Sequence, residues 1–519
     1  MKLERKTNAI RNIRIGLLNK VITIICPFVL RTVLIYTLGT QYLGLSSLFT
    51  SVLQVLSLSE LGIGSAMVFG LYQPIANDDI YKIRELTSLY RYVYRIIGTI
   101  ILLGGLAVLP FLSYFVKGSC PNDINIYILY LLYLINSSES YFLAAYKSTI
   151  LSAYQRRDII SEIGLVVHVL LYSIQIVCLL NFKNYYVYVI WIPIFTAVEN
   201  LATAKYVNTH YSNYIVKSHF LKNDIKNLLI KVRDLFGHKL SQVVTNSVDT
   251  IVISSFLGLK LVTIYNNYFY LMSAVAGILD ILYQAILAGI GNSLFSENEE
   301  KNQNDFKRFT VLNSWIVGWC AICFLCLFQP MMKIWMGKKL LLNGSTIVLL
   351  SVYFFVWKAR QPILIYKDAL GLWNIDKWKP YVEILVNLTV NILMVQTIGV
   401  NGIVISTIIS MILVSIPWET KCFFKNVFQD AQKQYLIITA RYISYTCVAG
   451  GITYGICRLI VDTGIGMFIL KIIICLIIPN LIILYLGRNN KLHNETIRFA
   501  ISLTPLKKIF VERDNKYDK

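Results

Sequence analysis

The fold class of this chain is decided by one stretch of sequence, NKVITIICPFVLRT, which runs from Asn19 to Thr32. The stretch lies in an otherwise apolar run, Ile15 to Leu38, that is long enough to cross a bilayer, because a membrane helix needs about 20 apolar residues. The run nevertheless contains Lys20 and Arg31, and each cation costs roughly 2.5–3.5 kcal/mol at the centre of a membrane helix. Two such cations need a physical reason to be there.

Apolar segments of this kind recur along the whole chain of 519 residues, of which 56% are hydrophobic and only 15% are charged. We therefore predict an all-α polytopic membrane protein with about 14 transmembrane helices. A large soluble helical protein is excluded, because no stretch is long and polar enough to form its outer surface. The predicted spans are 15–38, 43–72, 92–115, 124–146, 159–180, 184–204, 240–257, 261–294, 309–328, 345–366, 380–397, 400–418, 436–457 and 465–487.

The net charge of +21 is high enough to suggest nucleic-acid binding, so the placement of the cations decides between the two interpretations. Most Lys and Arg residues fall in alternate loops, on the side of the membrane that also holds both termini. This is the positive-inside pattern of a membrane protein, and it predicts cytoplasmic N- and C-termini and no nucleic-acid partner.

The basic segment 205–239 divides the chain into two comparable halves and is expected to lie on the anionic inner leaflet. Similar sequences follow the first and seventh spans, LGTQYLGLSSLF and LGLKLVTIYNNY, so the halves read as a repeat. Each half has six spans, an even number, so the repeat is parallel. The predicted parts are an N-terminal lobe (1–204), a cytoplasmic linker (205–239), a C-terminal lobe (240–418), two further spans (436–487) and a basic cytoplasmic tail (488–519).

Lys20 and Arg31 are eleven residues apart, which brings a helix back to nearly the same face. Pro27 lies between them on almost the same stripe, where it removes one backbone hydrogen bond and predicts a hinge. Two cations and a kink on one face indicate the wall of a hydrated cavity.

Further polar residues occur at corresponding places in the two lobes. Lys239, Gln242, Asn246 and Asp249 share one face of the seventh span, while Glu60 and Asp280 each lie in the second helix of a lobe. The expected substrate or cavity residues are Arg31, Lys20, Lys239, Asn246, Lys358 and Arg360; the residues expected to pair with them or to couple a proton or sodium ion are Asp249, Glu60 and Asp280. The alternatives are interhelical hydrogen bonds and, for the three lysines, chains that reach the membrane surface.

The sequence predicts neither a metal site nor a catalytic site. Cys320, Cys323 and Cys326 have ligand-like spacing in CAICFLC, but small residues on one face of a membrane helix favour helix packing. Nucleophile elbows, HExxH helices and Walker loops are absent from the sequence, so no enzyme and no cofactor are predicted.

The chain contains the stretches RTVLIYTLGTQYLGLSSLF, LSLSELGIGSAMVFGLYQPIANDD, NSVDTIVISSFLG, QPILIYKDALGLWNIDKWKPYVEILVNLTVNI and SIPWETKCFFKNVF. These stretches resemble bacterial polysaccharide flippases. These are the Wzx-like transporters of O-antigen and capsule repeat units, in the multidrug/oligosaccharidyl-lipid/polysaccharide exporter superfamily. The resemblance covers most of residues 8–430, and Arg31 matches the family's first-helix arginine.

The resemblance implies two six-helix lobes around a cavity, followed by two extra helices. It also implies alternating-access transport of undecaprenyl-diphosphate-linked oligosaccharide from the inner to the outer leaflet of the bacterial cytoplasmic membrane. Oriented Arg and Lys side chains would then replace the water around the diphosphate. The expected partners are the lipid-linked glycan and membrane lipids, with the polysaccharide polymerase and chain-length machinery as further candidates.

Two alternatives stay open at this point. One is an ion-coupled exporter of small molecules from the same superfamily, although such exporters typically carry an acidic residue in the first helix. The other is an integral membrane glycan polymerase, which would need a large outer loop with clustered acidic, basic or Arg residues.

The predicted topology can be tested by cysteine labelling from outside the cell. Single cysteines placed at Lys117, Lys183 and Lys260 should react, because the positive-inside pattern puts these loops outside. Cysteines in 205–235 should react only after the membrane is permeabilised. External labelling of 205–235 would contradict the two-lobe arrangement.

Overall fold

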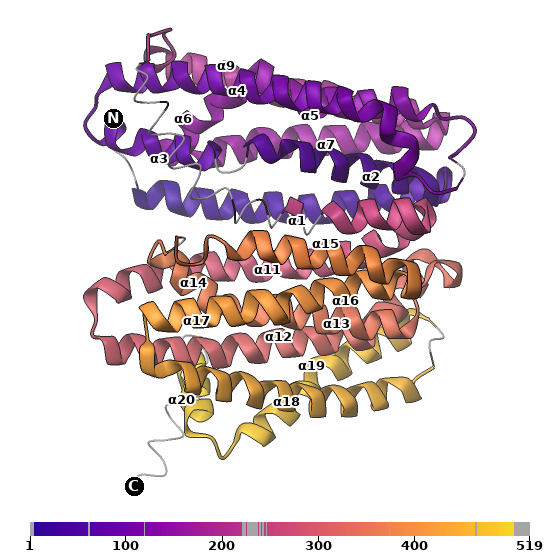
Figure 1. Cartoon of the computed structure of the whole chain (residues 1–519), viewed down its shortest axis with the longest axis vertical. Coiled ribbons are helices and arrows are strands. Elements are labelled where there is room, and N and C mark those ends of the chain that lie inside the picture. Colours follow the sequence, from indigo (N-terminus) through magenta and orange to yellow (C-terminus); the bar gives the residue numbers. More distant parts are fainter. Residues whose placement is uncertain are drawn as a thin grey trace. The chain divides into compact units, whose positions relative to one another are not determined.

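The computed structural model describes residues 5–60, 63–118, 120–220, 225, 237, 240, 243–244, 247–372, 374–461 and 464–502 (Figure 1). Every regular element in these ranges is helical. Ten of the described helices are long and apolar enough to cross a membrane, and shorter apolar helices lie at Ala66–Ala76 and Ser247–Leu257. The prediction of an all-α polytopic membrane protein is confirmed.

The chain forms two compact units. The first comprises Met1–Asn267 and the short segment Asn391–Gly399, and the second comprises Tyr268–Val390 and Val400–Lys519. The first unit thus contains the helix Ser247–Leu257 and the beginning of the helix after it, which the sequence analysis groups with the C-terminal lobe.

The first unit is a bundle of long helices joined by short turns. α1 packs along α7, α5 packs against α4 and α9, and α7 also contacts α9. An ion pair of 3.5 Å between Arg11 and the buried carboxylate of Asp158 links α1 to the first turn of α7. The helices are α1 (Arg5–Thr37), α2 (Thr40–Leu56), α3 (Ile63–Ala76), α4 (Ile80–Val108), α5 (Ile126–Leu143), α6 (Ser148–Ala153), α7 (Arg157–Phe182), α8 (Tyr185–Val189) and α9 (Trp191–His210), with 3₁₀ turns η1 (Ser57–Glu60), η2 (Leu109–Phe115), η3 (Ala145–Lys147) and η4 (Ser212–Tyr214).

A close backbone approach joins α2 to the start of α11 (Leu259–Ser296), still within the first unit. A side-chain carbon on Gly44 would collide with the backbone carbonyl of Leu259, so only glycine fits there. The Thr263 hydroxyl donates to the carbonyl oxygen of Thr40 at 2.6 Å, and the Lys117 amide donates to that of Ser254 at 3.0 Å. The stretch after the first span is therefore hydrogen-bonded to the eighth span, and the loop after the third span is hydrogen-bonded to the seventh.

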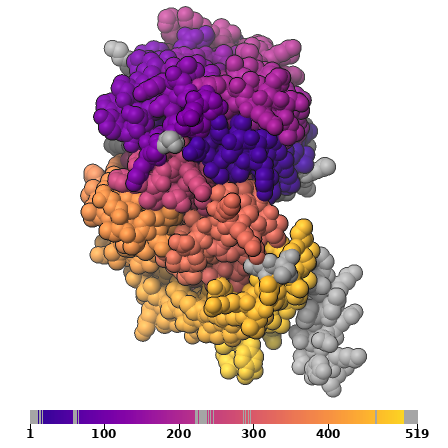
Figure 2. Space-filling view, turned by 90° about the vertical axis from the view of Figure 1, so that its right-hand side faces the viewer, coloured from indigo at the N-terminus to yellow at the C-terminus, as the bar shows by residue number. Residues whose placement is uncertain are grey.

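The second unit is built around α12. This long helix packs against α13, α18, α19 and α20, and Figure 2 shows the C-terminal helices in yellow against the salmon and orange helices of the same unit. The indole nitrogens of Trp315 and Trp319 donate to the Asn480 side chain and to the carbonyl oxygen of Cys475, both at 2.8 Å, which ties α12 to α19. The helices are α12 (Glu299–Met336), α13 (Gly344–Ala359), α14 (Gln361–Ala369), α15 (Lys379–Ile398), α16 (Val400–Ser410), α17 (Ile416–Asn426), α18 (Gln432–Leu459), α19 (Ile465–Gly487) and α20 (Lys491–Ser502), with short turns η5 (Lys338–Leu340), η6 (Asn374–Asp376) and η8 (Gln429–Ala431). The residues of α15 from Asn391 onward belong to the first unit.

Several predicted spans are interrupted helices. The span 43–72 breaks at the 3₁₀ turn Ser57–Glu60, and the span 345–366 breaks at Arg360, immediately before a helix with Pro362 in its first turn. The span 400–418 contains the π-helical segment η7 (Met411–Ser415). Breaks of this kind leave backbone N–H and C=O groups without their helical hydrogen-bond partners. Such breaks are frequent at functional sites. Two of the predicted site residues, Glu60 and Arg360, lie at such breaks.

Candidate functional site

Arg31 lies on α1 in the first unit, with its side chain partly exposed. Its Nη1 donates a hydrogen bond of 3.1 Å to the side-chain oxygen of Asn267, which is buried on α11. A guanidinium is planar and has five N–H donors, so an acceptor at one nitrogen restricts the positions that the rest of the fork can take. Asn267 therefore orients Arg31.

The other predicted residues of α1 are also described. Lys20 is partly exposed, eleven residues before Arg31 on the same helix, and α1 runs without interruption through Pro27. The hinge at Pro27 stays a prediction. Lys239 and Asn246 lie outside the described residues, as does Gln242 between them.

Glu60 lies in the 3₁₀ turn between α2 and α3, and its carboxylate accepts a hydrogen bond from the Tyr141 hydroxyl of α5. The ring of Tyr94 lies 5.8 Å from that of Tyr141, and both tyrosines face the same carboxylate. This hydrogen bond ties the turn that interrupts the second span to α5.

Asp249 is buried on the helix Ser247–Leu257 of the first unit. Its carboxylate accepts hydrogen bonds from the Asn391 amide at 2.9 Å and from the Tyr265 hydroxyl at 3.2 Å. Both donors are neutral, and within the described ranges no ion pair to Asp249 is present. The amide oxygen of Asn391, which is fully buried, has no hydrogen-bond donor among the described residues. Asp249 and Asn391 are thus joined by one hydrogen bond, and Asn391 keeps a buried amide oxygen without a donor among the described residues.

Asp280 and Lys358 form an ion pair in the second unit. The Lys358 ammonium on α13 lies 2.6 Å from a carboxylate oxygen of Asp280 on α11 and 4.3 Å from the centre of the Trp357 ring. Lys358 is 1% exposed, whereas the side chain of Asp280 is 51% exposed. The pair thus has one buried member and one exposed member.

Arg360 belongs to a buried charge network that connects α15 and α17 to the break between α13 and α14. Its guanidinium lies 3.3 Å from Glu419 and 3.9 Å from Glu383, and Lys379 pairs with the same two carboxylates. All four side chains are almost completely enclosed, and two cations balance two anions. Such a network is costly to desolvate and costly to break, because loss of one member leaves an uncompensated charge.

Sequence reasoning missed most of this network. Lys379, Glu383 and Glu419 lie at the ends of predicted spans, where charged residues are ordinarily solvated. The buried ion pair of 2.7 Å between Lys367 and Asp376 was missed for the same reason. The available signal was the density of charges of both signs between 367 and 383, in YKDALGLWNIDKWKPYVE.

No protein-family model and no curated protein matches the chain. Solved structures match it along most of its length. One described as the lipid II flippase MurJ in an inward closed conformation aligns with a TM-score of 0.65 and 16% identity, covering 93% of this chain and 99% of that one. An inward-facing multidrug resistance MATE transporter of the MOP superfamily aligns with a TM-score of 0.59, also at 16% identity, covering 78% and 94%.

A third match is a mutant of the MATE transporter VcmN from Vibrio cholerae, with a TM-score of 0.56 and 13% identity over 83% of this chain and 99% of that one. The chain therefore has the fold of these multi-pass membrane transporters and flippases.

The Asp280–Lys358 pair predicts an asymmetric response to mutation. Asp280→Asn should lower the stability of the protein by about 3–5 kcal/mol, because it leaves the enclosed Lys358 cation without its counter-charge. Lys358→Met should cost less, because water can solvate the exposed carboxylate of Asp280, and the double variant should regain much of the loss. Thermal unfolding in one detergent measures all three. An Asp280→Asn variant as stable as the parent would contradict this assignment.

Proposed function

We propose that this protein is a flippase that moves polyprenyl-diphosphate-linked oligosaccharide repeat units from the inner to the outer leaflet of the bacterial cytoplasmic membrane, by alternating access, during polysaccharide biosynthesis. The observation that carries the proposal is Arg31, a partly exposed guanidinium deep in an apolar helix, held at one nitrogen by Asn267. The fold that the chain shares with a lipid II flippase supports it.

The chemistry of the substrate explains why a cation is retained in α1. A diphosphate loses the stabilisation of water when it enters an apolar interior, and charge-assisted hydrogen bonds from a guanidinium replace part of it. Arg is better suited than Lys, because its planar fork matches two phosphate oxygens and stays charged. Lys20, on the same face of α1, supplies a second positive charge toward one end of the helix. The glycan occupies the hydrated cavity, and the polyprenyl chain stays in lipid.

The same charges disfavour the exporter alternative. A transporter of cationic drugs needs negative charge along its pathway, whereas the first helix has Lys20 and Arg31 within its apolar run. The partners proposed for the exported repeat unit are the polymerase and chain-length machinery that would use it at the outer leaflet.

The three carboxylates have different proposed roles. Asp280 is paired with Lys358, and Glu60 accepts from Tyr141, so both have structural partners. Asp249 has only neutral donors in the part of the chain that the structure describes, beside the buried amide oxygen of Asn391. Oxygen ligands of this type suit a proton or a hard cation such as sodium. We assign ion coupling to Asp249.

Substitutions of Arg31 test the proposed function. Arg31→Ala should leave folded protein in the membrane but reduce substrate affinity about ten- to hundredfold, because a charge-assisted contact contributes roughly 1.5–3 kcal/mol. Arg31→Lys should be intermediate and Arg31→Glu worst. The readout is glycan export in a flippase-deficient strain, normalised to protein level. Near-normal export by Arg31→Ala would remove Arg31 from the site, and drug export without any glycan lipid would favour the exporter.

Substitutions of Asp249 test the coupling assignment separately. Asp249→Asn keeps the size of the side chain and removes its charge, so export should lose its dependence on the proton or sodium gradient. Asp249→Glu should keep part of that dependence, and Glu60→Gln is the matched control that should keep all of it. Full gradient dependence in Asp249→Asn would make Asp249 a hydrogen-bonding core residue.

A further inference from the structure

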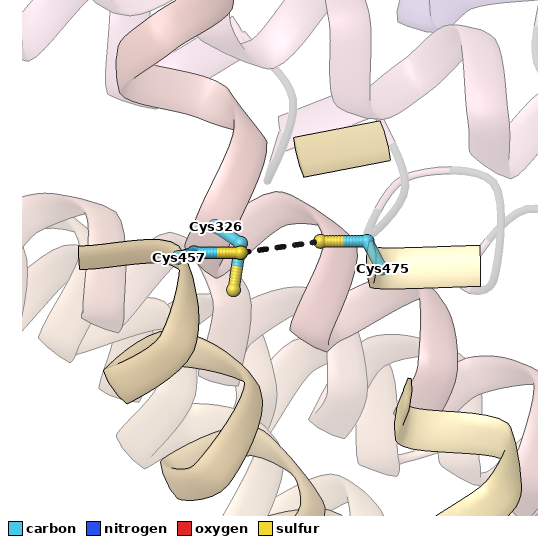
Figure 3. Close-up of side chains that lie close together, drawn as sticks. All are labelled: Cys326, Cys457 and Cys475. Atoms are coloured by element: carbon cyan, nitrogen blue, oxygen red, sulfur yellow. Dashed lines mark hydrogen bonds between the residues drawn. The ribbon is translucent and has the colours of Figure 1, made fainter. Parts of the chain in front are cut away.

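Three cysteines from three helices meet in the core of the second unit. Cys326 of α12, Cys457 of α18 and Cys475 of α19 are buried, with exposed fractions of 5%, 3% and 0%. Their sulfur atoms all lie within 4.8 Å of one another, and those of Cys457 and Cys475 are 4.0 Å apart. Figure 3 shows the sulfurs of Cys457 and Cys475 facing each other, with the side chain of Cys326 beside that of Cys457.

The spacing of the three sulfurs fits a metal ion bound between them better than it fits a disulfide bond. A disulfide has an S–S distance of about 2.05 Å, roughly half of the separation between Cys457 and Cys475. A cation held about 2.3 Å from each of three sulfurs places those sulfurs roughly 4.0 Å apart. We propose that Cys326, Cys457 and Cys475 bind a soft, thiophilic metal ion, Cu(I) or Zn(II).

The charges around the cluster fit a bound cation. Each thiol loses its proton to solvent when the metal binds, so three thiolates carry three negative charges. With these three thiolates alone, Zn(II) leaves one negative charge uncompensated and Cu(I) leaves two; a fourth thiolate on Zn(II) adds one more. Lys471 is buried one helical turn before Cys475 and interacts electrostatically with both Cys475 and Cys457. Its ammonium balances one negative charge in either case. In an apolar core this lowers the cost of the charge that the metal leaves uncompensated.

A fourth sulfur distinguishes the two metals. Cys323 precedes Cys326 by one helical turn, and its sulfur lies 4.0 Å from the carbonyl oxygen of Cys475 and interacts with the Cys475 thiol. Zn(II) prefers four ligands in a tetrahedron and would recruit Cys323, whereas Cu(I) is satisfied by the three central sulfurs.

The site would act as a cross-link. α18 and α19 follow the predicted C-terminal lobe in the chain, and they pack on α12. The surrounding residues are apolar: Val311, Ile322, Ala449 and Ile483 belong to the same buried cluster. A metal bound by one ligand from each helix would fix this pair to α12 more rigidly than apolar contacts alone.

The test uses the full chain, purified in detergent without oxygen from cells grown with added copper or added zinc. Elemental analysis should find about one metal ion per chain, and X-ray absorption at the edge of that metal should show sulfur neighbours only. Cys326→Ser, Cys457→Ser and Cys475→Ser should each reduce the bound metal roughly tenfold or more. Cys320→Ser, a buried cysteine of the same helix outside the cluster, is the matched control and should keep it.

Two further measurements separate the outcomes. Cys323→Ser should release zinc but retain copper, which identifies the metal. The thermal midpoint of unfolding should rise with metal content in the parent and in Cys320→Ser, and in no cluster variant, which a purely structural effect of serine would not produce. Chains without bound metal after growth in both media, a Cys457–Cys475 disulfide found by mass spectrometry, or equal metal loss in Cys320→Ser would overturn the proposal.

Discussion

The cost of placing a charge in an apolar helix governs how both units of this protein are organised. A buried charge is stable only when the protein supplies what water would have supplied, and here three solutions occur. Arg31 is oriented by an amide, Lys358 is neutralised by Asp280, and Arg360 shares two carboxylates with Lys379. The helices that carry these groups must then keep their positions relative to their partners, because a displaced partner leaves a charge uncompensated. The proposed substrate binding and the integrity of the fold therefore draw on the same kind of interaction.

The sequence predicted the helical membrane fold well, because apolar length and the distribution of Lys and Arg report directly on the bilayer. It also singled out Arg31, Lys358 and Asp280 as charges within apolar segments. It did not predict which cation pairs with which carboxylate. Lys358 and Asp280 are 78 residues apart, and only the folded chain brings them together. The buried network around Arg360 was missed because its other members lie at the ends of predicted spans, although the density of charges between 367 and 383 was a signal for it.

Broken helices and the cysteine cluster show a second limit. Hydropathy is averaged over a window, so it does not distinguish the interrupted helix at Ser57–Glu60 from a continuous one. Three cysteines at this spacing on one helix, Cys320, Cys323 and Cys326, favour helix packing. That interpretation leaves out side chains that other helices bring to the same place. Cys326 gains its neighbours from α18 and α19, at positions far along the chain. A pattern confined to one segment carries no information about a site assembled from three.

The discontinuity of the first unit has a consequence for biosynthesis. Asn391–Gly399 belongs to a unit whose other residues end at Asn267, so the ribosome must add more than a hundred residues before that unit is complete. Until then the amide of Asn391 cannot donate its hydrogen bond to the carboxylate of Asp249. Domains ordinarily finish folding in the order of their synthesis. The first unit of this protein becomes complete only after residues 268–390 of the second unit have been made.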